Sequence, residues 1–226
     1  MSEIMMTGAT GGIGQAVATA LAAAGHRLTV VGRDLDRLHG PGLRAITADL
    51  SQPQNLAHAV PEPGRLDALV HCAGISVDAI APVAGTGLSV WRDTMTVNTL
   101  AAAELTRLML PALRRGHGHV LFLNSARRTR AVPGWSAFAA SKAALQELAD
   151  SLRAEEADHG VRVTTIYPGA TATGQLRQVR ASFRRGYDPA QCIQPETLAA
   201  MVAWVLAAPP DAYVSELTVS AAPASR

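Results

Sequence analysis

The chain has 226 residues, of which 48% are hydrophobic and 17% charged, a composition typical of globular rather than disordered proteins. Its formal net charge is only +2, so no strong overall field favours nucleic acid or an anionic membrane as a partner. This length fits one substantial core, and we expect a single domain over residues 1–226.

Short apolar segments alternate with longer helical patterns along the whole chain. The segments expected to form strands are Glu3–Met6, Leu28–Val31, Arg44–Thr47, Ala68–His71, His119–Leu123, Arg162–Tyr167 and Val214–Val219. The segments expected to form helices are Ile13–Ala24, Pro53–Val60, Ser89–Leu113, Ser136–Asp158 and Glu196–Leu206. Several strands are apolar without alternation, as strands covered on both faces are. The repeated strand–helix–strand units predict an α/β fold: a Rossmann-type doubly wound parallel sheet of about seven strands with helices on both faces.

No segment predicts export, membrane insertion or a metal site. The most hydrophobic stretch, Ala16–Ala24, is too short to span a bilayer and contains Thr19, so we expect a buried helix. Cys72 and Cys192 show neither metal-ligand nor redox spacing. Ordinary thiols in a reducing cytoplasm are therefore the expectation.

A glycine-rich turn joins the first expected strand to the first expected helix, in the stretch Thr7-Gly8-Ala9-Thr10-Gly11-Gly12-Ile13-Gly14. Glycine allows a tight turn and lets backbone N–H groups approach a pyrophosphate at the helix N-terminus, where the helix dipole favours negative charge. The alternative is a glycine-rich turn without a ligand, but a position after the first strand is the one that a dinucleotide site requires. The candidate cofactor-binding residues here are Thr7, Gly8, Thr10, Gly12, Ile13 and Gly14.

Further motifs follow in order along the chain. They are His71-Cys72-Ala73-Gly74 after the fourth strand, Asn98 in Thr96-Val97-Asn98, Ser125 after the fifth strand, Phe138 followed by Lys142, and Pro168-Gly169-Ala170-Thr171-Ala172-Thr173. With the spacing of the glycine turn, they resemble the classical short-chain dehydrogenase/reductase family. The resemblance is close from Glu3 to about Thr173 and loose over the last helix and strand. It departs at His71 and Cys72, where the family has asparagines, and at Phe138, where the family has its catalytic tyrosine.

The resemblance implies a nicotinamide cofactor, contacted also by Ala73, Gly74, Lys142, Pro168, Gly169, Thr171 and Thr173. Asp49, which Leu50 follows, is similar to the family's adenine-contacting aspartate. At the end of the second strand, the planar guanidinium of Arg33 can pair with a ribose 2′-phosphate. Asp34 follows it, and an acidic residue at the end of this strand would instead bind a free 2′-hydroxyl. NADP(H) is therefore favoured over NAD(H). The alternative interpretation of Arg33 is a solvated turn residue that contacts no cofactor.

The resemblance also implies catalytic roles for Asn98, Ser125, Phe138 and Lys142. In the family the tyrosine exchanges a proton with the carbonyl oxygen, and the lysine lowers the pKa of the phenol and binds the nicotinamide ribose. The serine binds the carbonyl oxygen, and the asparagine is associated with a water connected to the lysine. Lys142, the only lysine of the chain, Ser125 and Asn98 match these positions. Phe138 has no hydroxyl proton to exchange, so we expect an NADP-dependent oxidoreductase of a carbonyl/alcohol pair that is inactivated or altered there.

Four interpretations of Phe138 remain open. A deliberate tyrosine-to-phenylalanine change, made to trap a complex, would leave the rest of a reductase intact. A natural enzyme could reduce a substrate that needs no enzymic acid, such as an iminium or a conjugated enone. A third interpretation is a non-catalytic NADP(H)-binding pseudoenzyme that serves as a regulator or scaffold. In the fourth, Ser125 or a water near Lys142 supplies the proton.

Two groups of arginines lie where a substrate is expected. They are Arg127, Arg128 and Arg130 after the serine, and Arg177, Arg180, Arg184 and Arg185 in a substrate lid over residues 174–195. An acidic substrate is one interpretation, and solvated loop arginines, favoured by the arginine-rich composition, are the other. Besides a small-molecule carbonyl or alcohol substrate, the family implies a homodimer or homotetramer formed through Ser89–Leu113 and Ser136–Asp158.

Overall fold

Seven parallel strands form one sheet in the order β3-β2-β1-β4-β5-β6-β7. The computed structural model describes residues 1–35, 42–76, 80–126, 131–209 and 211–223. The strands are β1 Glu3–Thr7, β2 Arg27–Gly32, β3 Leu43–Thr47, β4 Ala68–His71, β5 His119–Leu123, β6 Arg162–Pro168 and β7 Glu216–Val219. The chain runs outward from β1 to β3 and then crosses back to β4, so the boundary between β1 and β4 is the switch point of the sheet.

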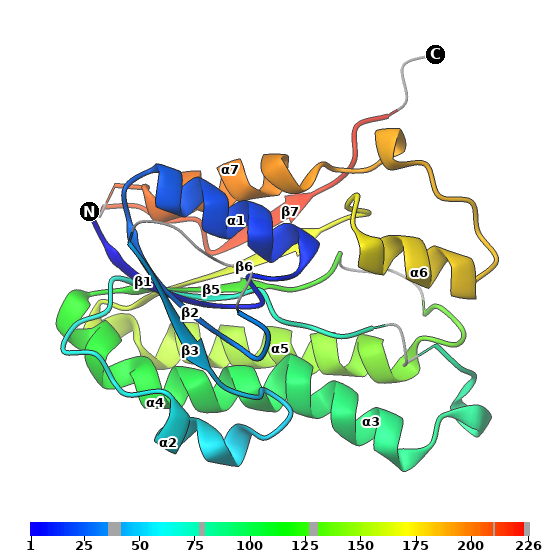
Figure 1. Ribbon diagram of the computed structural model, residues 1–226, viewed down its shortest axis with the longest axis horizontal. Coiled ribbons are helices and arrows are strands. Elements are labelled where there is room, and N and C mark those ends of the chain that lie inside the picture. The colour runs from blue at the N-terminus through cyan, green and yellow to red at the C-terminus, as the bar shows by residue number, and fades with distance from the viewer. Residues whose placement is uncertain (36–41, 77–79, 127–130, 210, 224–226) are drawn as a thin grey trace.

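Helices cover both faces of the sheet (Figure 1). They are α1 Gly12–Ala23, α2 Leu56–Ala59, α3 Leu88–Met95, α4 Ala101–Gly116, α5 Ser136–Glu155, α6 Gly174–Ser182 and α7 Pro195–Leu206. Because successive strand residues point to opposite faces, Met6 packs in the core beneath α1 and α7, whereas Met5 packs in the core beneath α4 and α5. The doubly wound parallel sheet predicted from the sequence is confirmed.

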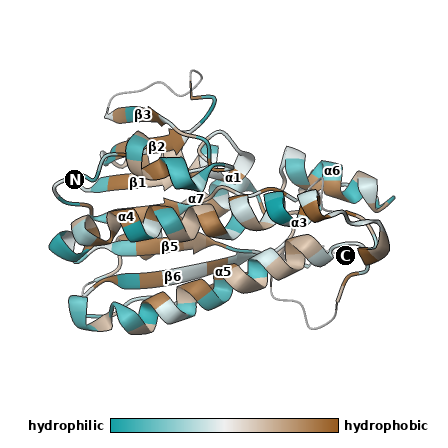
Figure 2. Ribbon diagram, turned by 90° about the horizontal axis from the view of Figure 1, so that it is seen from below, coloured by the Kyte–Doolittle hydropathy of each residue, from teal (hydrophilic) through white to brown (hydrophobic). Residues whose placement is uncertain are grey.

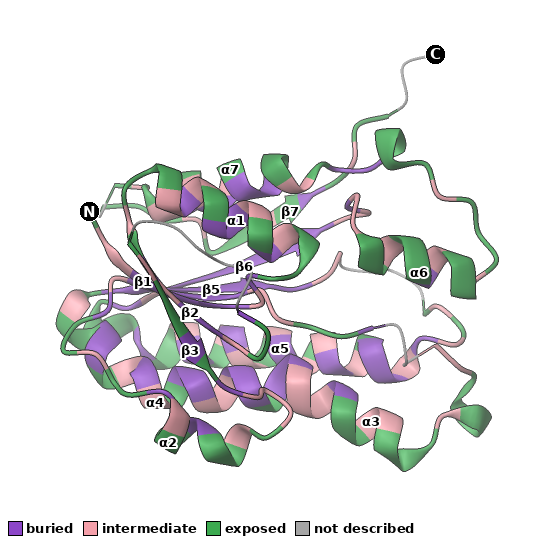
Figure 3. Ribbon diagram, viewed as in Figure 1, coloured by how far each residue is buried: buried purple, intermediate pink, exposed green. Residues whose placement is uncertain are grey.

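Burial explains the uninterrupted apolar runs of the central strands. Every residue of β4 and β5 is buried, because helices cover the sheet on both sides. The central strands are buried in Figure 3, whereas the outer strands β3 and β7 are partly exposed and the helices turn exposed and largely hydrophilic residues outward (Figures 2 and 3). None of the helices in the described residues is both long and apolar enough to cross a membrane.

Two helical segments differ from the sequence-based expectation. The segment predicted as one helix over Ser89–Leu113 consists of α3, a π-helical turn at Thr96–Leu100 and α4. The elements predicted from the sequence include no helix within residues 174–195, where the structure has α6. This helix begins after Thr173, whose side-chain oxygen accepts a hydrogen bond from the backbone N–H of Leu176 (3.1 Å).

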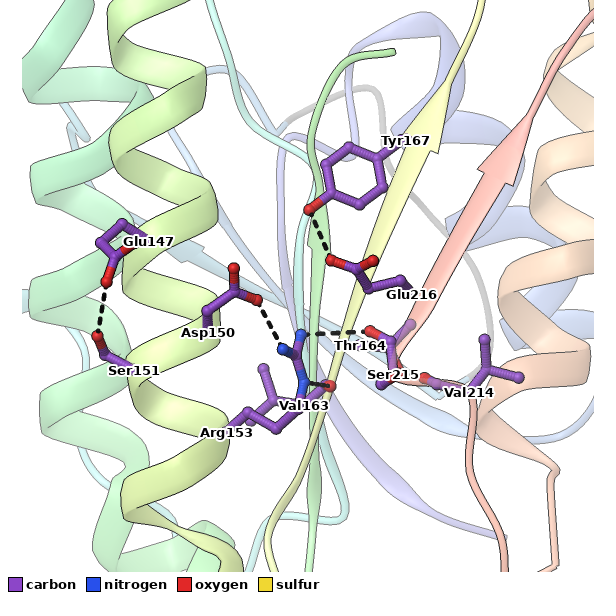
Figure 4. Close-up of polar contacts among 10 residues, drawn as sticks. All are labelled: Glu147, Asp150, Ser151, Arg153, Val163, Thr164, Tyr167, Val214, Ser215 and Glu216. Carbon is purple, nitrogen blue, oxygen red and sulfur yellow. Dashed lines mark hydrogen bonds and ion pairs between the residues drawn. The ribbon is translucent and has the colours of Figure 1, made fainter. Parts of the chain in front are cut away.

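Polar contacts fasten the last strands to helix α5 (Figure 4). Arg153 of α5 donates to the carbonyl oxygens of Val163 (3.0 Å) and Ser215 (3.3 Å), and so connects the helix to β6 and to the residue before β7. Tyr167 of β6 donates to the carboxylate of Glu216 on β7 (3.2 Å). The hydroxyl of this buried tyrosine therefore has a structural partner at the edge of the sheet.

Candidate active site and cofactor cleft

Two adjoining cavities lie at the carboxyl ends of the parallel strands. The larger has a volume of about 700 Å³ and is lined by the start of α1 and the segments after β2 and β3. The smaller has a volume of about 320 Å³ and is lined by the segments after β5 and β6 and by α5 and α6. Both are lined by Ile13, Cys72, Ala73, Gly74, Thr173 and Gln175. Doubly wound sheets bind their ligands at this edge, beside the switch point.

The glycine turn after β1 passes directly against the turn after β4. Gly8 has a φ of +75°, and a Cβ there would lie 2.5 Å from the backbone nitrogen of Ala73. A Cβ on Gly14 would lie 2.0 Å from the carbonyl oxygen of Gly8, so both positions require glycine. Gly11 precedes α1 and provides no side-chain cap, which leaves the N–H groups of the first helical turn for a bound anion.

Most of the predicted cofactor residues line this pair of cavities. Those at the larger cavity are Gly8, Thr10, Gly12, Ile13, Gly14, Arg33, Asp49, Leu50, Ala73, Gly74 and Thr173. Those at the smaller cavity include Lys142, Pro168, Gly169 and Thr171. Thr7 instead lies buried beneath the glycine turn, where its hydroxyl accepts a hydrogen bond from the backbone N–H of Ala73 (3.4 Å).

Arg33 and Asp49 lie together at the larger cavity, at the ends of β2 and β3. Hydrogen bonds from Ser51, chiefly from its backbone N–H at 2.9 Å, hold the pKa of Asp49 below its usual value, and the Arg33 guanidinium adds to this effect. The carboxylate of Asp49 is therefore ionised at neutral pH. Asp34, which complicates the prediction of cofactor preference, is exposed and does not line the cavity.

Asn98 lies in the π-helical turn and reaches the site from behind the cavity wall. Its buried side chain accepts from the backbone N–H of Ile75 (2.8 Å) and donates to the Ile75 carbonyl (3.0 Å). It also donates to Ser141 Oγ (2.9 Å), which in turn donates to the Phe138 carbonyl (2.8 Å). Asn98 thus fixes the turn after β4 against α5, a use that suits the irregular geometry of a π-helical turn.

Ser125, Phe138 and Lys142 line the same smaller cavity, although they come from two different elements. Phe138 and Lys142 are one helical turn apart on α5, and Ser125 follows β5. The Lys142 ammonium donates to the carbonyl oxygen of Leu123, the last residue of β5 (3.1 Å). Among the described residues that line either cavity, none is a tyrosine.

Burial shifts the titration of two neighbouring groups in this cleft. It lowers the pKa of Lys142 to about 8, against a smaller opposing effect of Cys72. It raises the pKa of the Cys72 thiol to about 12. At pH 7 the lysine is therefore mostly cationic, while the thiol is neutral and a poor nucleophile, as expected for an ordinary cysteine.

The remaining wall of the smaller cavity comes from residues that the sequence motifs did not identify. It includes Trp135, Leu176, Val179 and Phe183. The ring of Trp135 stacks on Phe138, with 4.6 Å between centroids, and meets Phe183 edge-on at 5.9 Å. Leu176, Val179 and Phe183 are three and four residues apart, the spacing of one helix face, and this was the available sequence signal.

The arginines of the expected lid divide into two pairs. Arg180 and Arg185 line the smaller cavity, whereas Arg177 and Arg184 do not. The other predicted group, within residues 127–130, lies outside the described residues. The start of α6 is tied to the turn after β4, because Gln175 donates a hydrogen bond to Ser76 Oγ (2.7 Å).

A family model described as short chain dehydrogenase matches residues 2–183. Glycine betaine reductase ATRR of Emericella nidulans is 32% identical over 233 residues, which cover 95% of this chain and 18% of that protein. Dehydrogenase/reductase SDR family member 7B of Bos taurus is 36% identical, with 74% of this chain and 57% of that protein covered. The chain thus spans only a part of these two relatives. The uncharacterized short-chain type dehydrogenase/reductase y4eK of Sinorhizobium fredii is 30% identical, with 95% and 89% covered.

Solved structures share the fold over nearly the whole chain. An alcohol dehydrogenase from the archaeon Thermococcus sibiricus, complexed with 5-hydroxy-NADP, superposes with a TM-score of 0.81 at 24% identity, over 98% of this chain and 97% of that one. A short-chain dehydrogenase from Burkholderia cenocepacia in complex with NADP gives a TM-score of 0.82 at 24% identity, over 97% and 88%. Given the matched family model and the relative that shares nearly its full length, the chain belongs to the short-chain dehydrogenase/reductase family.

Proposed function

We propose that the protein binds NADP(H) and has the site of a reductase acting on a small carbonyl/alcohol pair, with turnover limited by Phe138. One observation carries this proposal. Phe138, Ser125 and Lys142 line one cavity, and by the resemblance Phe138 stands where the family motif would have its tyrosine. No tyrosine among the described lining residues offers a substitute acid.

The residues present fit a phosphorylated dinucleotide. Gly8 and Gly14 leave room that a Cβ would fill, and the uncapped start of α1 favours an anion beside them. Arg33 lines the larger cavity and Asp34 does not, which favours a 2′-phosphate over a free 2′-hydroxyl. Two proteins of the same fold are complexed with NADP or 5-hydroxy-NADP, which supports the same class of cofactor here.

When bound, the nicotinamide supplies or accepts a hydride at the carbonyl carbon. Ser125 would hold the carbonyl oxygen, and Lys142 would place a positive charge beside it. Phe138 contributes packing but no proton, so the proton for the oxygen has to come from another group, such as Ser125 or a water near Lys142. The loss of a positioned general acid costs ~10²–10⁴ in rate, or about 3–5 kcal/mol in barrier. Slow turnover with intact cofactor binding follows from this arrangement.

The test is the substitution Phe138→Tyr, which restores a hydroxyl beside Lys142. We expect NADPH-dependent reduction of ketones and aldehydes to rise by about 10²–10⁴, because the cation favours the phenolate and makes the phenol a better acid–base group. Phe183→Tyr is the matched control, since Phe183 lines the same cavity but lies on a different element. The proposal is wrong if a folded Phe138→Tyr protein shows unchanged turnover across a broad carbonyl panel.

The charge of the smaller cavity separates the alternative functions. Its charged lining residues in the described part of the chain are Lys142, Arg180 and Arg185, all cationic, which disfavours a cationic iminium substrate. A neutral conjugated enone stays compatible with the site, because hydride addition at carbon needs no acid as strong as tyrosine. Measurable reduction of an enone by the unmodified protein would favour that alternative. Cofactor binding without turnover in either protein would favour the pseudoenzyme.

Cofactor preference depends on Arg33 and can be tested separately. We expect Arg33→Ala to weaken NADPH binding about tenfold and to leave NADH binding unchanged, because only NADPH carries the phosphate that the guanidinium would pair with. The measurement is a fluorescence titration with both cofactors. Arg44→Ala, an exposed arginine on β3 away from the cavity, is the control. An equal loss for both cofactors would contradict the assignment.

Assembly as a homodimer or homotetramer through α3, α4 and α5 is part of the proposal. Leu88 of α3 is 79% exposed and Leu100 of the π-helical turn is 50% exposed, which supports a covered surface on these helices. Light scattering after gel filtration tests it. We expect a mass at least twice that of one chain, and Leu100→Glu should reduce it.

A further inference from the structure

The smaller cavity has an apolar body. Trp135 and Phe138 stack, Phe183 meets Trp135 edge-on, and Val179 of α6 belongs to the same hydrophobic cluster. The cavity volume of about 320 Å³ suits a small molecule rather than a long chain. A ligand with an aromatic or branched apolar group would replace water along this wall and gain contacts of the kind that the rings already make with one another.

The lid end of the same cavity is cationic. Arg180 and Arg185 both line it, and the backbone N–H of Arg185 donates to the Arg180 carbonyl (2.8 Å), so the two are joined at the C-terminal end of α6. The Arg185 guanidinium carbon lies 5.5 Å from the centre of the Phe183 ring. The Arg180 guanidinium donates to the Gly186 carbonyl (2.9 Å). These contacts hold both cations beside the aromatic wall.

Among the residues that the structure describes, no carboxylate balances these cations at the cavity. Within the described residues, neither Arg180 nor Arg185 has an ion-pair partner, and none of the cavity-lining residues is an aspartate or glutamate. Exposed arginines elsewhere do pair, as Arg107 does with Glu104. An anionic ligand is therefore attracted to this end of the cavity, and its carboxylate can accept charge-assisted hydrogen bonds.

Resting on the proposed function, we infer that the substrate is an apolar carbonyl acid or the matching hydroxy acid. Its carbonyl lies at Ser125, its aromatic or branched group packs on Trp135 and Phe183, and its carboxylate pairs with Arg180 and Arg185. The cavity thus selects by charge at one end and by apolar contact along its side. A neutral ketone of the same shape leaves the two guanidinium groups without a counter-ion and binds more weakly.

The experiment compares 3-benzoylpropionate with its uncharged carboxamide by calorimetry, using protein saturated with NADP⁺ so that no reduction occurs. We expect the acid to bind about tenfold more tightly than the amide, and we expect this difference in affinity to shrink as the NaCl concentration is raised. We expect Arg180→Gln and Arg185→Gln each to weaken binding of the acid about fivefold and to leave binding of the amide unchanged. Arg177→Gln, on the exposed side of the same helix, should change neither.

Equal affinity for the two ligands overturns the inference, and so does an absence of binding by both. An equal effect of Arg177→Gln and Arg180→Gln on the acid also overturns it, because the field would then be general rather than local. The proposed function fails in a different way. If NADP⁺ does not bind but the acid still quenches tryptophan fluorescence more strongly than the amide, the cofactor proposal is wrong and the ligand inference stands.

Discussion

Two buried imidazoles make the folded state sensitive to mild acid. Burial lowers the pKa of both His71 and His119 from 6.5 to about 3. The geometry of His119 supports this direction. Thr164 Oγ donates its proton to the Val214 carbonyl and so accepts from His119 Nε2 (2.7 Å), which leaves Nδ1 unprotonated. Nδ1 has no partner in the described residues, so a proton there would be a buried donor without an acceptor.

The sign and size of the effect follow from proton linkage. Because the folded pKa values are depressed, the unfolded chain binds more protons between about pH 3 and 6.5, and stability falls as the pH drops through that range. At pH 5 each histidine costs about 2 kcal/mol relative to neutral pH, so the pair costs about 4 kcal/mol. That is a large share of the roughly 5–15 kcal/mol that stabilises a typical domain.

Urea denaturation followed by circular dichroism at pH 7.5, 6 and 5 measures this loss. We expect His119→Gln to reduce the loss by about half, since one of the two titrating groups is gone. His58→Gln, an exposed histidine on α2, should leave the pH dependence unchanged. A loss below about 1 kcal/mol between pH 7.5 and 5, or the full loss in His119→Gln, would show that these two histidines do not cause the acid sensitivity.

Two further substitutions test the glycine turn and the ion pair of the buried Glu156. Gly14→Ala places a Cβ 2.0 Å from the Gly8 carbonyl oxygen, so we expect NADPH titration to show at least a ~100-fold loss of affinity. Gly64→Ala is the control and should leave the affinity unchanged, because no atom lies within 4 Å of the added Cβ. Glu156 is buried and pairs with Arg114 through two hydrogen bonds of 2.8 and 2.6 Å. Glu156→Gln should lower the urea-derived stability at pH 7 by ~1–3 kcal/mol. The loss stays below that of a fully buried ion pair, because Arg114 is only partly buried. The more exposed pair of Glu104 provides the comparison, and Glu104→Gln should cost less than ~0.5 kcal/mol.

The apolar pattern predicted the sheet well because parallel strands are buried on both faces. Ala68–His71 and His119–Leu123 are strands with the predicted bounds, and the other strands differ by one or two residues at their ends. The apolar pattern does not reveal the π-helical turn at Thr96–Leu100, because one extra residue in a helical turn has no compositional signature, and only the resemblance at Asn98 pointed to an interruption of the helix there. What makes it visible is the three hydrogen bonds of Asn98, which depend on segments distant in the sequence.

The candidate site was likewise predicted from the sequence only in part. The glycine turn could be predicted, because its position after β1 and its spacing reflect backbone constraints that are local in the sequence. The resemblance placed a substrate lid over residues 174–195, but its apolar wall could not be predicted, since the place of α6 depends on how the helix packs beside Trp135. The many arginines of this segment also made the apolar face of α6 at Leu176 and Val179 hard to recognise in the sequence. A short amphipathic helix of this kind is recognised only when its partner surface is known.

The position of β1 has a consequence for how the protein is made. It is synthesised before the other strands, yet it lies between β2 and β4, so that Ile4 pairs with both Leu28 and Ala68. During translation the backbone hydrogen-bonding groups on one edge of β1 therefore stay unpaired until the ribosome has added tens of further residues, and every other pairing also needs a crossover. An unpaired strand of this kind is prone to associate with other nascent chains. Slower synthesis at low temperature, or co-expressed chaperones, should therefore raise the yield of folded protein more than any change at the outer strand β7.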